Sequence, residues 1–229
     1  MSEEDCTKII DNLKDVFEIY VYSDIAKNSR IIEEAPNYHH RAINLKDELD
    51  KVSKVNRKFY EFYQEIQKIL TSTKDLHFNI LAHNTPKGLK FSQYRVSLPF
   101  NFEIEKDKDN KYRIFIKENK FTKNCNVNMQ NFIKSHLNIA LKAINDIDPF
   151  DYIQNWSKYH QLKSPHAQFV YMLDIIPNFI LSYFPVDYSD LYNEYEFDDN
   201  SLIKLMYFNN FDSINENDIE FNNYYIKFS

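Results

Sequence analysis

Glycine is nearly absent from this 229-residue sequence, which contains it only at Gly88. Phosphate-binding loops, dinucleotide-binding fingerprints and nucleophile elbows all need glycines where the backbone packs closely or takes a positive φ. A chain with one glycine cannot build any of these motifs. The sequence therefore argues against enzymes that depend on them, and it predicts no bound cofactor.

Cysteine is also scarce. Cys6 and Cys125 lie far apart and form no CxxC pair, so we expect two free thiols and no disulfide scaffold. The acidic N-terminus lacks the basic and apolar regions of a signal peptide. Residues 169–184 are almost wholly apolar, but they fall short of the roughly 20 residues that a membrane span needs and contain Asp174 and Pro177. We expect a buried, proline-kinked helix there and a soluble, cytoplasmic protein without a membrane segment.

No excess of positive charge is present, since the net charge is -6 and the pI is about 5.7. Acidic and basic residues are interleaved, which argues against nucleic acid or anionic lipid as a partner. Hydrophobic residues make up 43% of the chain, with 19 Phe and 17 Tyr, which is enough for a packed core. The length allows one large domain or two small ones. We place a boundary after residue 124, between a helical layer with a β-hairpin (1–124) and an α+β portion (125–229).

Helical signals dominate the first 73 residues. Ser2 and Asp5 fit a capping box that opens a helix over residues 4–22. Asn44 can cap a short helix at 45–52, and Asn56 can cap the next helix. That helix carries an apolar stripe and ends at residues 71–73. The stripe consists of Phe59, Phe62, Tyr63, Ile66, Ile69 and Leu70.

Alternation typical of a strand runs over residues 96–105, where Pro99 suggests an edge position or a bulge. A polar turn at 106–111 leads to a partner strand at 112–117. Residues 137–145 permit helix or strand, and we favour a strand. Asp148-Pro149 and Ser164-Pro165 each open a helix with proline at its first position, and Trp156 is expected in the core.

Alternation of apolar and polar residues in the last part of the chain predicts two strands, one ending at residue 197 and one over 202–208, joined by the turn 198–201. The chain ends in a strand-like run at 224–229, which suggests a fragment or a shortened paralogue. Together these signals predict an α+β protein. Its N-terminal helices would pack on a mixed or antiparallel sheet, followed by a second, small α+β portion.

A candidate for chemistry is the strand-like stretch 74–83. Side chains alternate along a strand, so Asp75, His77 and His83 should share one face. An acid two residues before a histidine could orient the imidazole for proton transfer. A structural histidine is the alternative. His77 and His83 would lie about 20 Å apart at ~3.3 Å per residue, too far to share one metal ion unless the strand ends between them.

The remaining histidines and acids predict no site. The adjacent pair His39 and His40 lies in an expected loop (27–44) with no further ligand at a telling spacing, so we predict no metal centre. His136, His160 and His166 are isolated. The acid pairs Asp187/Asp190 and Asp198/Asp199 lie beside turn-forming residues, which explains them without catalysis.

Four motifs follow one another in a recognisable order: Asp75-Leu76-His77-Phe78, then Ser97-Leu98-Pro99-Phe100, then residues 144–153, then residues 195–200. In this order the chain resembles the N-terminal, pre-catalytic half of S41-type serine peptidases, and within them the tricorn-like branch. The resemblance covers most of residues 45–208.

The resemblance implies that His77 is a general base and Asp75 its structural neighbour. It also implies that residues 144–153 border a small interaction module. The family's catalytic serine lies far downstream in a glycine-rich core that this chain lacks. We therefore expect a part that presents His77, binds polypeptide and is inactive alone. The alternative is a non-enzymatic protein- or peptide-interaction module whose histidines are structural.

Overall fold

The computed structural model describes residues 1–20, 23–27, 42–75, 95–157, 159–162, 164–180 and 192–209. It is an α+β protein, as the sequence predicts. The chain divides into two compact units. Unit 1 comprises residues 1–81 and 158–168, and unit 2 comprises 82–157 and 169–229. The boundary expected after residue 124 falls inside unit 2.

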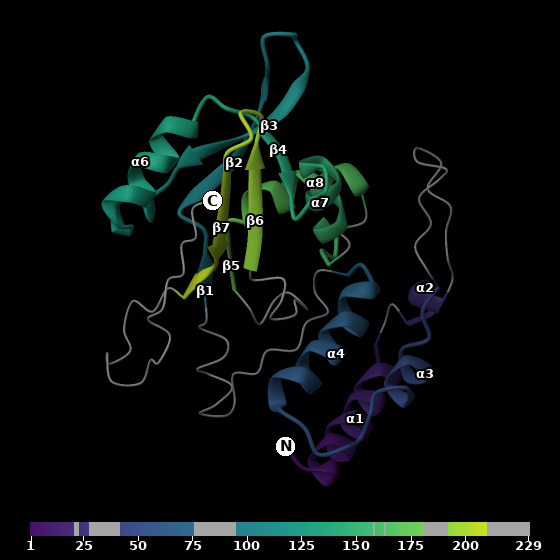
Figure 1. Ribbon diagram of the computed structural model, residues 1–229. Helices are drawn as coiled ribbons and strands as arrows, with labels where there is room; N and C mark the ends of the chain where they lie inside the picture. The colour runs from purple at the N-terminus through teal and green to yellow at the C-terminus, as the bar shows by residue number, and fades with distance from the viewer. Residues whose placement is uncertain are drawn as a thin grey trace. The chain divides into compact units, whose positions relative to one another are not determined.

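Unit 1 consists of helices in its described part (Figure 1): α1 (Glu3–Glu18), α2 (Ser23–Lys27), α3 (Leu45–Asp50), α4 (Phe59–Ser72) and the first residues of α8. The capping box is confirmed, because the backbone N–H of Asp5 donates to Ser2 Oγ at 3.1 Å and the N–H of Ser2 donates to Asp5 Oδ2 at 3.2 Å. The helix was expected to reach residue 22, which is wrong: α1 ends at Glu18. The aromatic and β-branched residues that follow have low helix propensity.

The core of unit 1 joins α1, α3 and α4. Burying each large apolar side chain contributes roughly 1.5–3 kcal/mol, so this cluster is the main stabilising feature of the unit. The predicted stripe on α4 is confirmed at Phe62, Tyr63, Ile66 and Leu70, all of which are buried. The buried cluster contains Cys6, Ile10, Phe17, Ile43, Leu45, Leu49, Val52, Phe62, Ile66 and Leu70.

Asn56 does not cap α4, which begins after Lys58. Its side-chain oxygen instead accepts the backbone N–H of Glu3 at 2.9 Å, in the first turn of α1. Asn56 is thus a capping residue, as its type suggests, but it caps α1, whose first turn lies 53 residues away in the sequence. This bond fixes the loop before α4 to the start of α1.

In its described part, unit 2 has three antiparallel sheets, with strand orders β5-β1-β8, β2-β3 and β4-β6-β7. All strand pairs within the described residues are antiparallel. The strands are β1 (Arg95–Ser97), β2 (Phe100–Lys106), β3 (Tyr112–Glu118), β4 (Leu141–Ile144), β5 (Asn178–Ile180), β6 (Tyr192–Phe197), β7 (Leu202–Met206) and β8 (Phe208–Asn209).

The predicted hairpin is confirmed, with Phe100 opposite Glu118 and Lys106 opposite Tyr112. Pro99 has a larger effect than a bulge. The alternating run divides at Leu98 and Pro99 into β1 and β2, which belong to different sheets. Proline has no N–H to donate to a ladder, so pairing stops there and resumes with new partners.

The helices of unit 2 include one that the sequence analysis missed. This helix is α6 (Val127–His136). Asn126 caps its N-terminus, because the Asn126 side chain accepts the backbone N–H of Met129 at 2.9 Å. The sequence could have predicted this helix from the capping residue Asn126 and from the helical spacing of Met129, Ile133 and His136, which the structure buries. The short helix η1 (Thr122–Asn124) precedes α6. The predicted start of α7 (Pro149–Ser157) at its proline is confirmed.

The long helix expected over residues 169–184 is wrong. Helix α8 (Pro165–Ile175) begins at its predicted proline but ends two residues before Pro177, and β5 follows. The carbonyl of Pro177 accepts the N–H of Leu98 at 2.7 Å, which joins this turn to the end of β1. In the described part of the chain, no helix is long and apolar enough to cross a bilayer.

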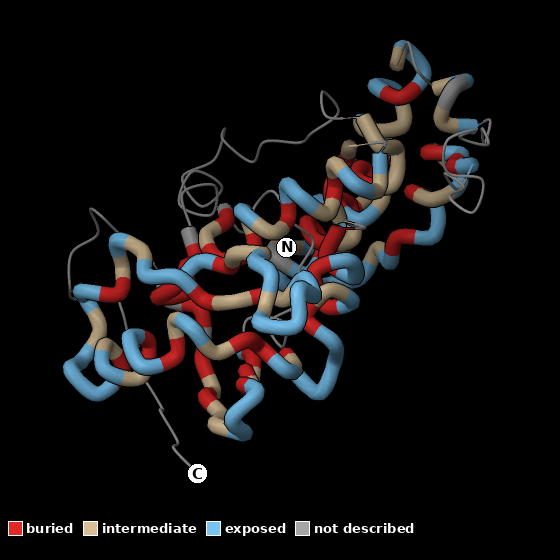
Figure 2. The backbone as a smooth tube through the Cα atoms, turned by 90° about the horizontal axis from the view of Figure 1, so that it is seen from above, coloured by how far each residue is buried: buried red, intermediate tan, exposed pale blue. Residues whose placement is uncertain are grey.

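Aromatic side chains fill the core of unit 2. Phe100 and Tyr195 meet edge to face, with ring centroids 5.3 Å apart, and both are fully buried. Trp156 packs edge to face on Phe179 at 5.5 Å, so the core position expected for it is confirmed. Figure 2 shows short buried stretches alternating with exposed ones along the chain, as amphipathic strands and helices require.

Among the described residues, left-handed turns are made by residues other than glycine. Asn110, Asn145, Asp146 and Asn200 take positive φ values of 52–65°. Their short polar side chains tolerate this region better than other residues do. Lys74, just after α4, is the exception, with φ 55°. Because this conformation is unfavourable for a lysine, contacts with the rest of the protein must hold the backbone of Lys74 in it.

Candidate functional site

The junction after α4 carries the residues that the sequence singled out. Asp75 is described, and its carboxylate accepts a 2.5 Å hydrogen bond from the hydroxyl of Tyr20, which lies just after α1. His77 and His83 lie outside the described residues, as does the strand expected to carry them. The bond to Tyr20 therefore ties the residue after the end of α4 to the end of α1.

Lys74 is the unexpected residue at this junction. Its Nζ donates to the backbone carbonyl of His160 at 2.8 Å. Burial of the side chain lowers the pKa of Lys74 from 10.5 to about 8. Taking an ammonium group out of water disfavours its charged form, which explains the direction. No local pattern marks this lysine, because its hydrogen-bond partner lies 86 residues later in the chain.

His160 lies next to this lysine and is held neutral. Its Nδ1 accepts the backbone N–H of Leu162 at 3.0 Å, which places the ring proton on Nε2. Burial, and then the charge of Lys74, lower the pKa of His160 to about 4. The sequence analysis assigned His160 no chemistry, and the structure gives it a structural bond within the segment 158–168.

His136 and Ser201 form the closest serine–histidine pair in the described part of the chain. Ser201 Oγ lies 2.7 Å from His136 Nε2, and His136 Nδ1 lies 2.7 Å from the carbonyl oxygen of Phe132. Because the carbonyl can only accept, Nδ1 carries the proton and Nε2 accepts from the serine hydroxyl. The imidazole also stacks on the ring of Phe132, with centroids 3.9 Å apart.

This pair is better suited to holding α6 against the β6–β7 turn than to catalysis. The Asp199 carboxylate lies 3.6 Å from the same Nε2 and accepts the backbone N–H of Ser201 at 2.9 Å. Hydrogen bonds from Ser201 lower the pKa of Asp199, so the carboxylate stays ionised. A fixed negative charge beside the serine opposes the oxyanion of acyl transfer. His136 as a whole is only 7% exposed.

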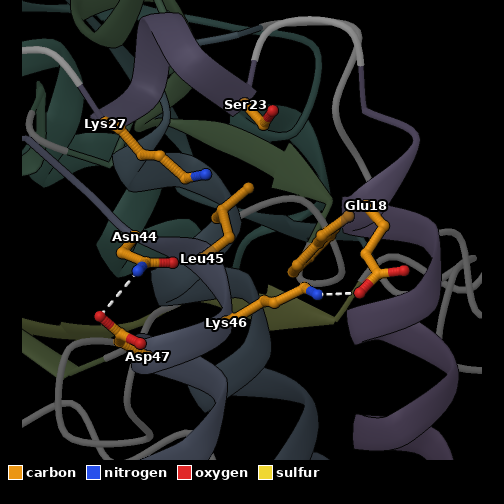
Figure 3. Close-up of a pocket in the computed structure, with 8 residues that line it drawn as sticks. Glu18, Ser23, Lys27, Asn44, Leu45, Lys46 and Asp47 are labelled. Atoms are coloured by element: carbon orange, nitrogen blue, oxygen red, sulfur yellow. Dashed lines mark hydrogen bonds and ion pairs between the residues drawn. The ribbon is translucent and has the colours of Figure 1, made fainter.

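A pocket of about 320 Å³ lies in unit 1 where the end of α1, the helix α2 and the start of α3 meet (Figure 3). Two hydrogen bonds position α2: Ser23 N–H donates to the carbonyl of Tyr20 at 3.0 Å, and Ile43 N–H donates to that of Ala26 at 2.7 Å. The pocket is lined by Phe17, Glu18, Ser23, Lys27, Asn44, Leu45, Lys46 and Asp47.

The pocket combines an apolar base with a charged rim. Phe17 and Leu45 are buried, at 3% and 4% exposure. Across the rim, Lys46 forms an ion pair with Glu18, and its hydrogen bond lowers the pKa of the Glu18 carboxyl. Lys27 extends over Leu45 in Figure 3 and makes no hydrogen bond or ion pair with any residue that the structure describes.

Two of the lining residues at the start of α3 bond each other (Figure 3). Asn44 Nδ2 donates to Asp47 Oδ2 at 2.7 Å, so this amide, expected to cap α3, does not bond its backbone. Asn44 was the only lining residue that the sequence analysis singled out. The others are ordinary charged and apolar helix residues, and no motif in the sequence marks them.

No metal centre emerges from the described residues, in which no three His, Cys, Asp or Glu side chains group together. His39, His40 and the acids Asp187 and Asp190 lie outside the described part. Asp198 bonds Arg113 on β3 at 2.6 Å, which gives it a partner within the fold.

Comparisons with protein-family models, with curated proteins and with solved structures gave no match to this chain.

Proposed function

We propose that this chain is a polypeptide-binding protein and that the pocket formed by α1, α2 and α3 is where it binds. The observation that carries the proposal is the combination of a buried apolar base and a charged rim in one pocket of about 320 Å³. That volume is near the lower end of ligand pockets, roughly 300–1,000 Å³, so one or two residues of a polypeptide would fill it.

The surface beside the pocket suits a longer polypeptide. Val16 and Ile19 flank the lining residues of α1 and are 49% and 80% exposed. They stand three positions apart, so they share one face of the helix end. Exposed apolar side chains beside a charged pocket supply contact area outside it, as protein interaction sites require.

Binding is tested with an array of synthetic nine-residue peptides of random sequence and the full-length chain. Asn44→Trp places a large ring at the pocket, and Ser53→Trp adds the same ring at an exposed position outside the lining residues. We expect the wild type and Ser53→Trp to bind a common set of peptides that Asn44→Trp does not bind. Equal binding by all three proteins, or no binding by the wild type, contradicts the proposal.

The second candidate is the pre-catalytic part of an S41-like serine peptidase. One observation favours it: the segment that leads to His77 starts from a fixed point, since Asp75 is bonded to Tyr20 and Lys74 to the carbonyl of His160. In this candidate function Asp75 is the structural neighbour and His77 the general base. Both candidate functions include polypeptide binding.

His77→Ala separates the two candidates. In a form completed with a downstream serine core, loss of peptide hydrolysis with an unchanged circular dichroism spectrum supports the peptidase function. Unchanged hydrolysis contradicts it. Peptide binding at the pocket by the isolated chain is expected to survive this substitution under both candidates.

A further inference from the structure

We infer that the pocket of unit 1 recognises a carboxylate of its polypeptide ligand and that Lys27 is the residue that binds it. This inference rests on the proposed polypeptide-binding function and names the chemical class of the bound group. It follows from the state of the four charged side chains that line the pocket.

Three of the four charges are engaged. Glu18 and Lys46 neutralise each other, and the carboxylate of Asp47 accepts a hydrogen bond from Asn44. The ammonium group of Lys27 has no such partner among the described residues, although it extends over the apolar base of the pocket. A ligand that fills this space meets a cation first, and an anion is its complement.

The class of anion follows from the size and the base of the pocket. A carboxylate on a short aliphatic stem could bond Nζ of Lys27 while its methylene groups contact Leu45. The hydroxyl of Ser23, which also lines the pocket, can donate a second hydrogen bond to the same group. Asp and Glu side chains and the C-terminal carboxylate of a polypeptide share this chemistry.

Three small probes distinguish the sources. N-acetylglutamate α-methylamide carries only a side-chain carboxylate, N-acetylalanine carries only a terminal one, and N-acetylglutamine methylamide carries neither. Each is titrated into the ¹⁵N-labelled full chain, and the amide signals of Lys27 and Leu45 are followed. We expect at least one acid to shift these signals saturably and the neutral probe to bind about fivefold more weakly, which corresponds to ~1 kcal/mol.

The matched variants are Lys27→Gln and Lys58→Gln, which make the same charge change inside and outside the pocket; Lys58 is exposed. We expect Lys27→Gln to remove the preference for acids, together with its weakening by salt, and Lys58→Gln to retain both.

Equal affinity for the acidic and neutral probes, or an acid preference that survives Lys27→Gln, overturns the inference. Polypeptide binding itself is judged separately, by the peptide array and Asn44→Trp. The array can therefore support the pocket while the probes refute the carboxylate.

Discussion

Replacing Lys74 by methionine should change how the stability of the protein depends on pH. Lys74 is the buried lysine at the end of α4, and its pKa falls from 10.5 to about 8 because burial disfavours the ammonium group. Methionine keeps a long, unbranched side chain and the same Cβ at this positive φ, so the substitution removes the charge without relieving the backbone.

The magnitude follows from the linkage between protonation and folding. Below about pH 8 the lysine is protonated in both states, and the full cost of burying the charge is present. As the pH rises from 8 to 10.5, the folded state releases its proton first, so the free energy of unfolding rises. Over this interval the gain is roughly 3 kcal/mol at ~1.4 kcal/mol per pH unit.

The assay is urea unfolding followed by circular dichroism at several pH values between about 7 and 10.5. The helical signal includes α1 to α4 of unit 1 together with α6 and α7 of unit 2, so the wild type and the variant are compared over the whole transition. We expect the difference in unfolding free energy, wild type minus Lys74→Met, to become more positive by roughly 3 kcal/mol from the lower to the upper pH limit. Near pH 7 the variant no longer buries a charge, which stabilises it, but it also loses the bond to the His160 carbonyl, which destabilises it. The net effect should be a variant that is more stable by about 1–2 kcal/mol.

Lys58→Met is the control, because Lys58 is exposed and the substitution makes the same change of side chain. Its pH dependence should follow that of the wild type. If Lys74→Met and the wild type gave parallel curves from pH 7 to 10.5, the ammonium group would not be desolvated in the folded protein, and the reasoning would fail.

Three further outcomes are expected. The pKa of His160 is lowered to about 4 from 6.5, so stability should fall as the pH drops through this interval, and His160→Gln should flatten that fall in urea unfolding. His136→Phe keeps the stacked ring but loses the bond to Ser201, and it should lower the unfolding free energy of unit 2, measured by Trp156 fluorescence, by about 1–3 kcal/mol. An unchanged midpoint would show that this bond does not hold α6 against the β6–β7 turn. Burial raises the pKa of the Cys125 thiol to about 11, so it should react with a disulfide reagent near pH 8 roughly a hundredfold more slowly in the folded than in the urea-unfolded protein, and equal rates would contradict that burial.

The sequence alone determined those elements whose signals are local. The capping box at Ser2 and the proline starts of α7 and α8 depend on residues within one helical turn. The hairpin of β2 and β3 depends on alternation and a short polar turn. In each case neighbouring residues fix the backbone, so the pattern and the structure agree.

Tertiary structure decided everything that depends on distant partners. Asn56 caps α1 across 53 residues, Tyr20 bonds Asp75 across 55, and Ser201 bonds His136 across 65. The pocket of unit 1 likewise needs three helices to meet, and its charged residues look ordinary in the sequence. Burial and pairing of charge arise only when the chain folds back on itself, so the pKa of Lys74 and the unpaired state of Lys27 among the described residues could not be read from local spacing.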